Sequence, residues 1–271
     1  MRKFCILLCC VFTLAFVMSC EERMNFEREL GYQEATRMCP KIEKLISEAR
    51  HGDVEAYDAL ALCYRDGDGV EQSDFNMITM YMLSCRKSGK NIEDVIKTLD
   101  VNNPLRLLID VLDRPDIEQA PQEMVLKLRS LSPADALVYD AIYTFECRND
   151  TLAALQLFKE AVEKGSDMAC ILQIGLYERL GYEDKLEQSI HEYANRFPVL
   201  YVKLGKLSVQ RGSERSLEQA VKFFTIADNY GMLTVSGARE LLDVYRILGK
   251  NGRIKCDQEE IDRLECLAKY K

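Results

Sequence analysis

The sequence predicts an all-α fold, an α-solenoid (α-α superhelix) of antiparallel helix pairs that is preceded by a signal peptide. Three observations predict it. Small and aromatic residues recur at helical spacing along paired segments, a glycine follows the second segment of a pair, and this arrangement returns in the same register further along the chain. Fixed-period repetition of helical pairs is typical of solenoids, in which each pair buries its apolar face against its neighbours.

The clearest repeat occupies residues 49–89. Ala56, Leu60 and Tyr64 share one helix face, a glycine-rich turn follows, and a second helix begins near Asp74 and ends at Gly89. The positions that define this repeat are Ala49, Gly52, Ala56, Leu60, Tyr64, Gly67, Gly69, Asp74, Tyr81 and Gly89. The second half returns twice, with the defining residues Ala154, Ala161 and Gly165, and then Ala220, Phe223, Ala227 and Gly231.

The N-terminal residues have the pattern of a secretory signal. Met1-Arg2-Lys3 is a short basic stretch, and an apolar run from Phe4 to Met18 follows, too short to span a bilayer as a helix. Val17-Met18-Ser19-Cys20 then resembles a bacterial lipobox, which implies a lipid on Cys20 after cleavage. The acidic residues after Cys20 resemble surface-export signals of some Gram-negative gut bacteria. We therefore expect an outer-membrane anchor, on either the periplasmic face or the cell surface. The alternatives are an ordinary secretory signal and a buried apolar strand.

The glycine-rich turn carries a more specific resemblance. The pattern Ala49-x-x-Gly52-x₃-Ala56-x₃-Leu60-x₃-Tyr64-x-x-Gly67-x-Gly69-Val70, followed by Asp74-x₆-Tyr81 and Gly89, resembles the SLR (Sel-one-like repeat) family, a relative of tetratricopeptide repeats. One residue is inserted before Asp74, and Ala61 replaces a usual glycine. The resemblance implies a superhelix whose concave groove binds peptides or proteins.

These patterns divide the chain into parts. Residues 1–19 are predicted to be a lipoprotein signal peptide, 20–26 a lipidated tether and 27–271 the solenoid. The solenoid comprises the clear repeat at 49–89, an irregular part at 91–131 and repeats over 132–271. Ahead of the clear repeat, residues 26–38 have helical spacing, and Pro40 is placed to begin a helix that runs to Arg50. The first helices of the pairs, which line the groove of such a superhelix, are expected at 53–64, 133–147, 167–180, 199–211 and 235–248.

The charge and the cysteines exclude several classes of function. The net charge is −8, and removal of Arg2 and Lys3 with the signal peptide leaves 34 basic against 44 acidic residues, so we expect no nucleic-acid binding. Eleven cysteines and two histidines show no Cys-x-x-Cys and no metal-ligand spacing, so neither a metal nor a cofactor is predicted. Cys63 and Cys85 either form a disulfide within the first repeat or fill alanine-like positions in its core; we favour the second interpretation, since Cys85 aligns with Ala161 and Ala227.

The run Asp66-Gly67-Asp68-Gly69 invites comparison with a calcium loop. Counted from Asp66, position 5 is Val70 and position 12 is Met77, where an EF-hand requires oxygen ligands. The same glycines follow no strand and precede no Lys-Ser/Thr, so they are not a phosphate loop. We interpret the run as a tight turn between helices.

These features predict a membrane-anchored scaffold at the bacterial cell envelope that binds an unidentified protein or peptide in its groove, and no catalytic residue. The first alternative is an envelope enzyme of the cysteine-rich SLR type, acting on cell-wall or β-lactam-like substrates through an unpaired cysteine. In those relatives a disulfide joins cysteines eight positions apart, whereas the residue eight positions after Cys85 is Glu93. The second alternative is a structural spacer whose groove holds no ligand.

Overall fold

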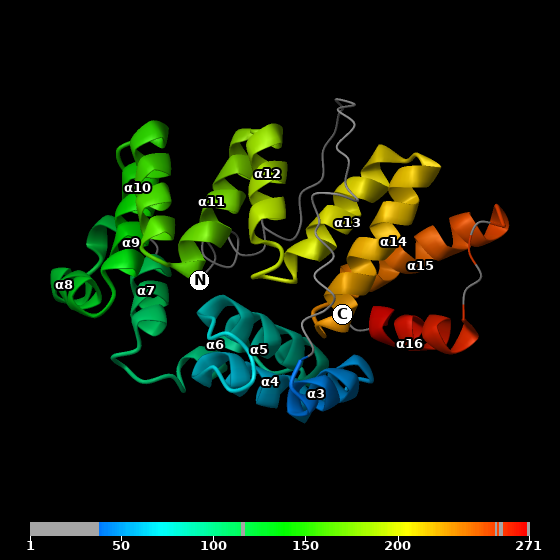
Figure 1. Ribbon diagram of the computed structural model, residues 1–271. Helices are drawn as coiled ribbons and strands as arrows, with labels where there is room; N and C mark the ends of the chain where they lie inside the picture. Colours follow the sequence, from blue (N-terminus) through cyan, green and yellow to red (C-terminus); the bar gives the residue numbers. More distant parts are fainter. Residues whose placement is uncertain (1–37, 115–116, 253, 255–256, 270–271) are drawn as a thin grey trace. The chain divides into compact units, whose positions relative to one another are not determined.

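The computed structural model describes residues 38–114, 117–252, 254 and 257–269. Every regular element in these ranges is a helix, and the helices follow one another in antiparallel pairs, as the sequence predicted for an α-solenoid (Figure 1). The signal peptide, the tether and Cys20 lie outside the described residues. The elements are α3 (Pro40–Arg50), α4 (Val54–Asp66), α5 (Asp74–Ser88), α6 (Ile92–Ile96), α7 (Pro104–Leu112), η1 (Ile117–Gln119), α8 (Gln122–Leu131), α9 (Pro133–Glu146), α10 (Thr151–Glu163), α11 (Asp167–Leu180), α12 (Glu183–Tyr193), α13 (Leu200–Arg211), α14 (Glu214–Asn229), α15 (Val235–Lys250) and α16 (Gln258–Ala268).

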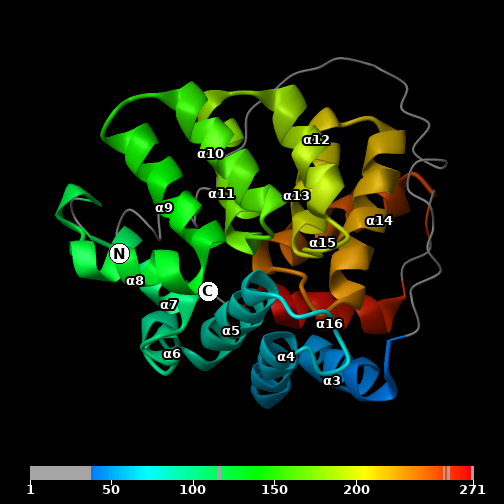
Figure 2. The same ribbon diagram turned by 60° about the vertical axis from the view of Figure 1, so that its left-hand side comes forward.

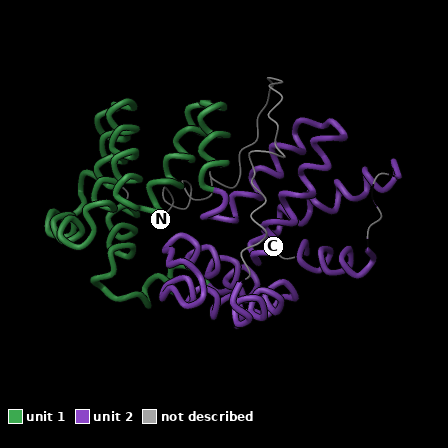
Figure 3. The backbone as a smooth tube through the Cα atoms, in the orientation of Figure 1, with its two compact units in different colours: residues 1–14, 91–193 green, residues 15–90, 194–271 purple. Residues whose placement is uncertain are grey.

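The described residues form two compact units (Figure 3). The first unit contains residues 91–193, and the second combines residues 38–90 with residues 194–269. The second unit therefore contains helices from both ends of the described chain. No helix among the described residues combines the length and the apolar character needed to cross a membrane.

In the first unit, α9 packs on α10, and α11 packs on both α10 and α12 (Figure 2). The carboxylate of Asp135 joins two successive pairs, because it accepts hydrogen bonds from Ser132 Oγ at 2.7 Å and from Ser166 Oγ at 2.6 Å. These serines are the N-caps of α9 and α11, so one side chain fixes the starts of two neighbouring first helices. The stretch 91–131, predicted to be irregular, contains the short helix α6, the apolar helix α7, η1 and α8.

In the second unit, α4 packs on α5 and α13 packs on α14, in the side-by-side arrangement that Figures 1 and 2 both show. The two sequence segments that make up this unit contact each other here. Asn76 of α5 donates to the carbonyl oxygen of Arg196 at 2.8 Å, and the Phe75 and Phe197 rings meet edge to face at 5.3 Å. A Cβ at Gly231 would lie 3.9 Å from Ile46 of α3, which places the end of α14 against α3.

The apolar positions that define the repeats are buried in both units. Their side chains are at most 6 % exposed: Ala49, Ala56, Leu60, Tyr64, Ala154, Ala161, Ala220, Phe223 and Ala227. Tyr81 and Asp74 are only half-buried. The turn after α4 depends on glycine, since Gly67 and Gly69 have φ of 71° and 80°, values that other residues rarely adopt. Gly52, Gly89, Gly165 and Gly231 also have positive φ.

The five predicted first helices are present with small shifts in their ends. They correspond to α4, α9, α11, α13 and α15. The largest difference is at α4, which starts one residue later than predicted and continues to Asp66. Its N-cap is Asp53, whose carboxylate accepts from the backbone N–H groups of Glu55 and Ala56.

Candidate functional site: the Asp228 cluster and the Cys63 pocket

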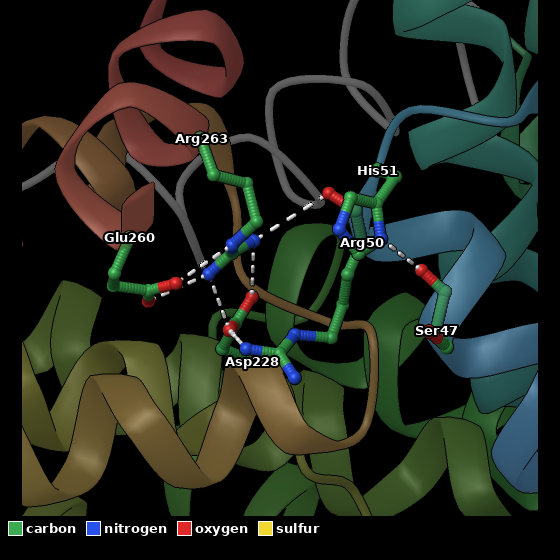
Figure 4. A network of polar contacts seen from close by, with 6 residues as sticks. All are labelled: Ser47, Arg50, His51, Asp228, Glu260 and Arg263. Carbon is green, nitrogen blue, oxygen red and sulfur yellow. Dashed lines mark hydrogen bonds and ion pairs between the residues drawn. The ribbon is translucent and has the colours of Figure 1, made fainter. Parts of the chain in front are cut away.

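The most buried charged group at a junction of distant segments is Asp228, near the end of α14. Its carboxylate is 4 % exposed and lies 2.6 Å from the Arg50 guanidinium of α3. Arg263 of α16 binds the same carboxylate through two nitrogens, at 2.6 and 3.2 Å (Figure 4). Because α3 is the first and α16 the last helix of the described residues, Asp228 joins helices that are far apart in the sequence. We call these residues, with Glu260, the Asp228 cluster.

Glu260 completes the coordination of Arg263. Its two carboxylate oxygens accept from Arg263 Nε at 2.9 Å and Nη2 at 2.8 Å. Burial opposes the charge on Arg263, but the bonds to Glu260 and the attraction of Asp228 are stronger and raise the pKa of the guanidinium above its usual value. Such a fork-to-fork pair fixes geometry as well as charge. The charged groups of the cluster bind one another, so its role is to hold α3, α14 and α16 together.

Lys87 of α5 lies next to this cluster. Its ammonium is 5.0 Å from the centre of the Tyr57 ring. Burial, and secondarily the positive charge of Arg263, lower the pKa of Lys87, while Asp228 acts in the opposite direction. With Lys87, three cations therefore lie close to the two carboxylates of the Asp228 cluster.

The lowered pKa predicts a pH-dependent effect of Lys87 on stability. Between that pKa and the ordinary value of 10.5, the unfolded chain binds more protons than the folded chain, so this residue's contribution becomes more favourable as pH rises. In Lys87→Met, we expect the stability relative to wild type to decline as the pH rises toward 10.5. Urea unfolding at a series of pH values measures it. A stability difference that does not change with pH contradicts the assignment.

His51 follows α3 as its C-cap. Its Nδ1 lies 2.7 Å from the carbonyl oxygen of Ser47, so the ring is held by the helix from which it emerges (Figure 4). His191 lies in α12, 3.7 Å from Glu187. Among the described residues, no group of three or more His, Cys, Asp or Glu side chains is placed to hold a metal ion.

A pocket of about 380 Å³ lies between α3 and α4, with the buried thiol of Cys63 in its wall. Burial raises the pKa of the Cys63 thiol; Lys41 opposes this rise, and Asp68 and Cys39 add to it. A thiol whose pKa is raised is protonated at neutral pH and is a weak nucleophile. The pocket is lined by Lys41, Lys44, Leu45, Glu48, Ala59, Leu62, Cys63, Asp66 and Asp68.

None of the described cysteines forms a disulfide bond, so Cys63 and Cys85, both buried, are not linked to each other; Cys256 lies outside the described residues. The two aspartates of the glycine-rich turn are engaged in ion pairs. Asp66 binds Arg65 at 2.7 Å, and Asp68 binds Lys41 of α3. These contacts fit the interpretation of the run as an interhelical turn.

The helix pairs and the buried alanine seams define the class of this molecule: an all-α helical-repeat protein. The chain is similar to a Sel1 repeat protein from Oxalobacter formigenes, with 21% identity over 80% of this chain and 87% of that chain and a TM-score of 0.43. No protein-family model and no curated protein matches the sequence.

Proposed function

We propose that the protein is a lipid-anchored scaffold of the bacterial cell envelope that holds a protein or peptide partner on its first helices. The stacking of antiparallel pairs supports this proposal most directly. Repetition of one two-helix unit places successive first helices side by side within each unit, as α9 with α11 and α13 with α15. Neighbouring first helices of this kind present extended surfaces to which a peptide can bind.

Polar side chains lie where two of these first helices meet. Lys206 of α13 is 3.1 Å from Ser236 Oγ and 3.4 Å from a carboxylate oxygen of Glu240, both on α15. Burial raises the pKa of Glu240 in spite of Lys206. Half-buried groups of this kind hydrogen-bond strongly because water is partly excluded. Such groups can hydrogen-bond to the backbone of a peptide or form an ion pair with one of its charged groups.

The enzyme alternative lacks an activated nucleophile at Cys63. Neither Lys41 nor any other neighbour lowers the pKa of that thiol below its ordinary value. Acyl transfer through a cysteine requires the thiolate or an adjacent base that removes the proton. The scaffold is therefore the function that the geometry supports best.

The lipid anchor is part of the same proposal and comes from the sequence around Cys20. Each buried CH₂ contributes about 0.8 kcal/mol, so several acyl chains hold a protein on a membrane permanently. A tethered scaffold also raises the local concentration of its partner, so that modest affinity is sufficient.

One experiment with two arms tests the proposal in the native host. Cys20→Ala is expected to move the protein from the membrane fraction to the soluble fraction, while Cys266→Ala, which changes an exposed thiol, leaves it in membranes. If Cys20→Ala still partitions wholly with membranes, the lipid assignment is wrong.

The second arm captures partners from the envelope with the mature chain. A specific partner is expected to bind wild type and to be reduced at least about tenfold, or roughly 1.4 kcal/mol, by the charge reversal Glu240→Lys. Reversal of the exposed Asp243 on the same helix serves as the control. Retention of every captured protein by Glu240→Lys argues against the first helices as the binding face.

A further inference from the structure

The turn that follows α15 contains Asn251 directly before Gly252, and this is the one Asn-Gly pair in the sequence. Both residues are exposed to solvent. In such a pair the backbone nitrogen of the glycine can attack the side-chain amide carbon of the asparagine. Glycine permits this approach better than any other residue, because it has no Cβ and adopts many backbone conformations. The turn therefore carries the sequence signature of an asparagine that can lose its amide without an enzyme.

In the folded turn, the reacting groups of this pair are held apart. Asn251 is the C-cap of α15, with φ of −83° and ψ of 1°. At a ψ near 0°, the Gly252 nitrogen lies on the side of the Asn251 backbone nitrogen, away from the Asn251 side chain. The Gly252 N–H also donates to the carbonyl oxygen of Gly249 at 3.0 Å. Attack on the side chain therefore requires the last turn of α15 to open, as the ends of helices do most readily.

The side chain of Asn251 joins the end of α15 to the start of α14. Its Nδ2 donates a hydrogen bond to a carboxylate oxygen of Glu214 at 3.2 Å. Glu214 is the first residue of α14. An ionised carboxylate has no donor, so the same contact after loss of the amide would place two negative groups against each other. The link between the two helix ends thus depends on the amide of Asn251.

Beyond the turn, the chain returns to a buried apolar cluster of α14 and α15. The cluster consists of Leu217, Val244 and Leu248, and Ile254 packs against it. Only two residues separate Asn251 from Ile254, so the position of Ile254 depends on the length of the backbone through the turn. Close-packed apolar contacts of this kind tolerate little change in that length.

We propose that Asn251 is a site of spontaneous deamidation and that its product releases the end of α15 from α14. Hydroxide removes the proton from the Gly252 nitrogen, which then forms a bond to Asn251 Cγ. The Cγ–Nδ2 bond breaks and ammonia leaves, so that a succinimide ring remains. Water adds to one of the two ring carbonyl carbons, and the bond from that carbon to the ring nitrogen breaks. The net reaction consumes water and releases ammonia, with no oxidation or reduction.

The two products of ring opening weaken the turn in different ways. Opening at Cγ gives aspartate, which places a negative charge beside Glu214 and at the C-terminal end of α15, where the helix dipole disfavours it. Opening at the backbone carbonyl carbon gives isoaspartate, which carries the same charge and adds a carbon to the main chain ahead of Ile254. Either product therefore favours the open turn over the closed one, so that an opening that was reversible becomes lasting.

Peptide mass spectrometry tests the site after the purified full-length chain has been stored at neutral to mildly alkaline pH. Asn251 is expected to gain the mass of amide hydrolysis at least about tenfold faster than Asn102. Asn102 is also exposed, but Asn103 follows it instead of a glycine. The rate at Asn251 should rise with pH, because the deprotonated nitrogen is the nucleophile. Equal rates at Asn251 and Asn102, or no conversion of Asn251, overturn the proposal.

Hydrogen exchange of the variant Asn251→Asp tests the structural consequence. Backbone amides in the last turn of α15 and the first turn of α14 are expected to exchange at least about threefold faster than in wild type, in keeping with the size of charge effects at helix ends. Addition of Glu214→Gln removes the facing carboxylate and should restore part of the protection, while amides of α9, in the other unit, stay unchanged. Exchange at the wild-type rate in Asn251→Asp, or a fast rate that Glu214→Gln does not lower, overturns the release of α15.

Discussion

Replacement of Asp228 by alanine is expected to lower the free energy of unfolding by about 3 kcal/mol. The substitution leaves Arg50 and Arg263 facing each other without the carboxylate that binds both. Removal of one partner from a buried ion pair costs about 3–5 kcal/mol, because the remaining charge stays desolvated. Arg263 is 11 % exposed but retains Glu260, and Arg50 is 31 % exposed. We therefore place the effect at the lower end of this range.

Thermal or urea unfolding monitored by circular dichroism measures this loss. For a chain of this size, about 3 kcal/mol corresponds to a fall in Tm of roughly 6–12 °C. Asp243→Ala is the matched control, since Asp243 forms an exposed ion pair with Arg246 at 2.9 Å, and pairs of that kind contribute about 0–1 kcal/mol. Equal losses in the two variants would show that the Asp228 cluster contributes no more than a surface pair.

The helix pairs were predictable because their determinants are local. Ala154 and Ala161, seven residues apart, lie on one face of α10, and both are fully buried. Serine, threonine, aspartate or asparagine precedes most of the described helices at the position where its side chain bonds the first turn, as Ser132 and Asp150 do. Within such a segment, spacing and end signals determine the structure before any distant contact forms.

The Asp228 cluster could not be predicted, because its contacts are not local. In the sequence, Asp228 directly follows the buried Ala227, and Arg50 directly follows the buried Ala49. Both charged residues can therefore be recognised as lying near the buried contacts between helices. Periodicity does not tell which distant helix will supply the counter-charge. Here α3 and α16 supply it, and more than two hundred residues separate Arg50 from Arg263.

Two helices show no amphipathic pattern for other physical reasons, although the bounds of α11 were predicted at 167–180. α11 is buried on all sides from Asp167 to Leu176, so its apolar residues form no stripe that marks a core face. The irregular part at 91–131 includes α6, a helix of 5 residues without a buried side chain. A helix of this length has no amphipathic pattern, so its sequence does not distinguish it from irregular structure.

Replacement of Gly205 by alanine, at the contact between α13 and α14, is the second change for which we expect a large effect on the free energy of unfolding. A Cβ on Gly205 would lie 2.6–2.8 Å from three carbons of the Phe224 ring, which is fully buried. Because the ring is fully buried among other side chains, either the ring or the two helices must shift to accept the added methyl group. Overpacking of this kind costs about 1–3 kcal/mol and outweighs the gain of up to about 1 kcal/mol from replacing a helical glycine.

Gly249 of α15 offers the matched comparison within the same unit. A Cβ there meets nothing within 4 Å, so Gly249→Ala is expected to stabilise the protein by about 0.5–1 kcal/mol. Gly205→Ala is expected to destabilise it by about 1–2 kcal/mol, and chemical denaturation of both variants measures the contrast. In the background of Phe224→Leu, the cost of Gly205→Ala should shrink, because the two positions share one contact. If Gly205→Ala is as stable as Gly249→Ala, then α13 and α14 do not cross as closely as the structure places them. In that case the close contact of small residues, on which the repeat architecture depends, is not what holds this helix pair together.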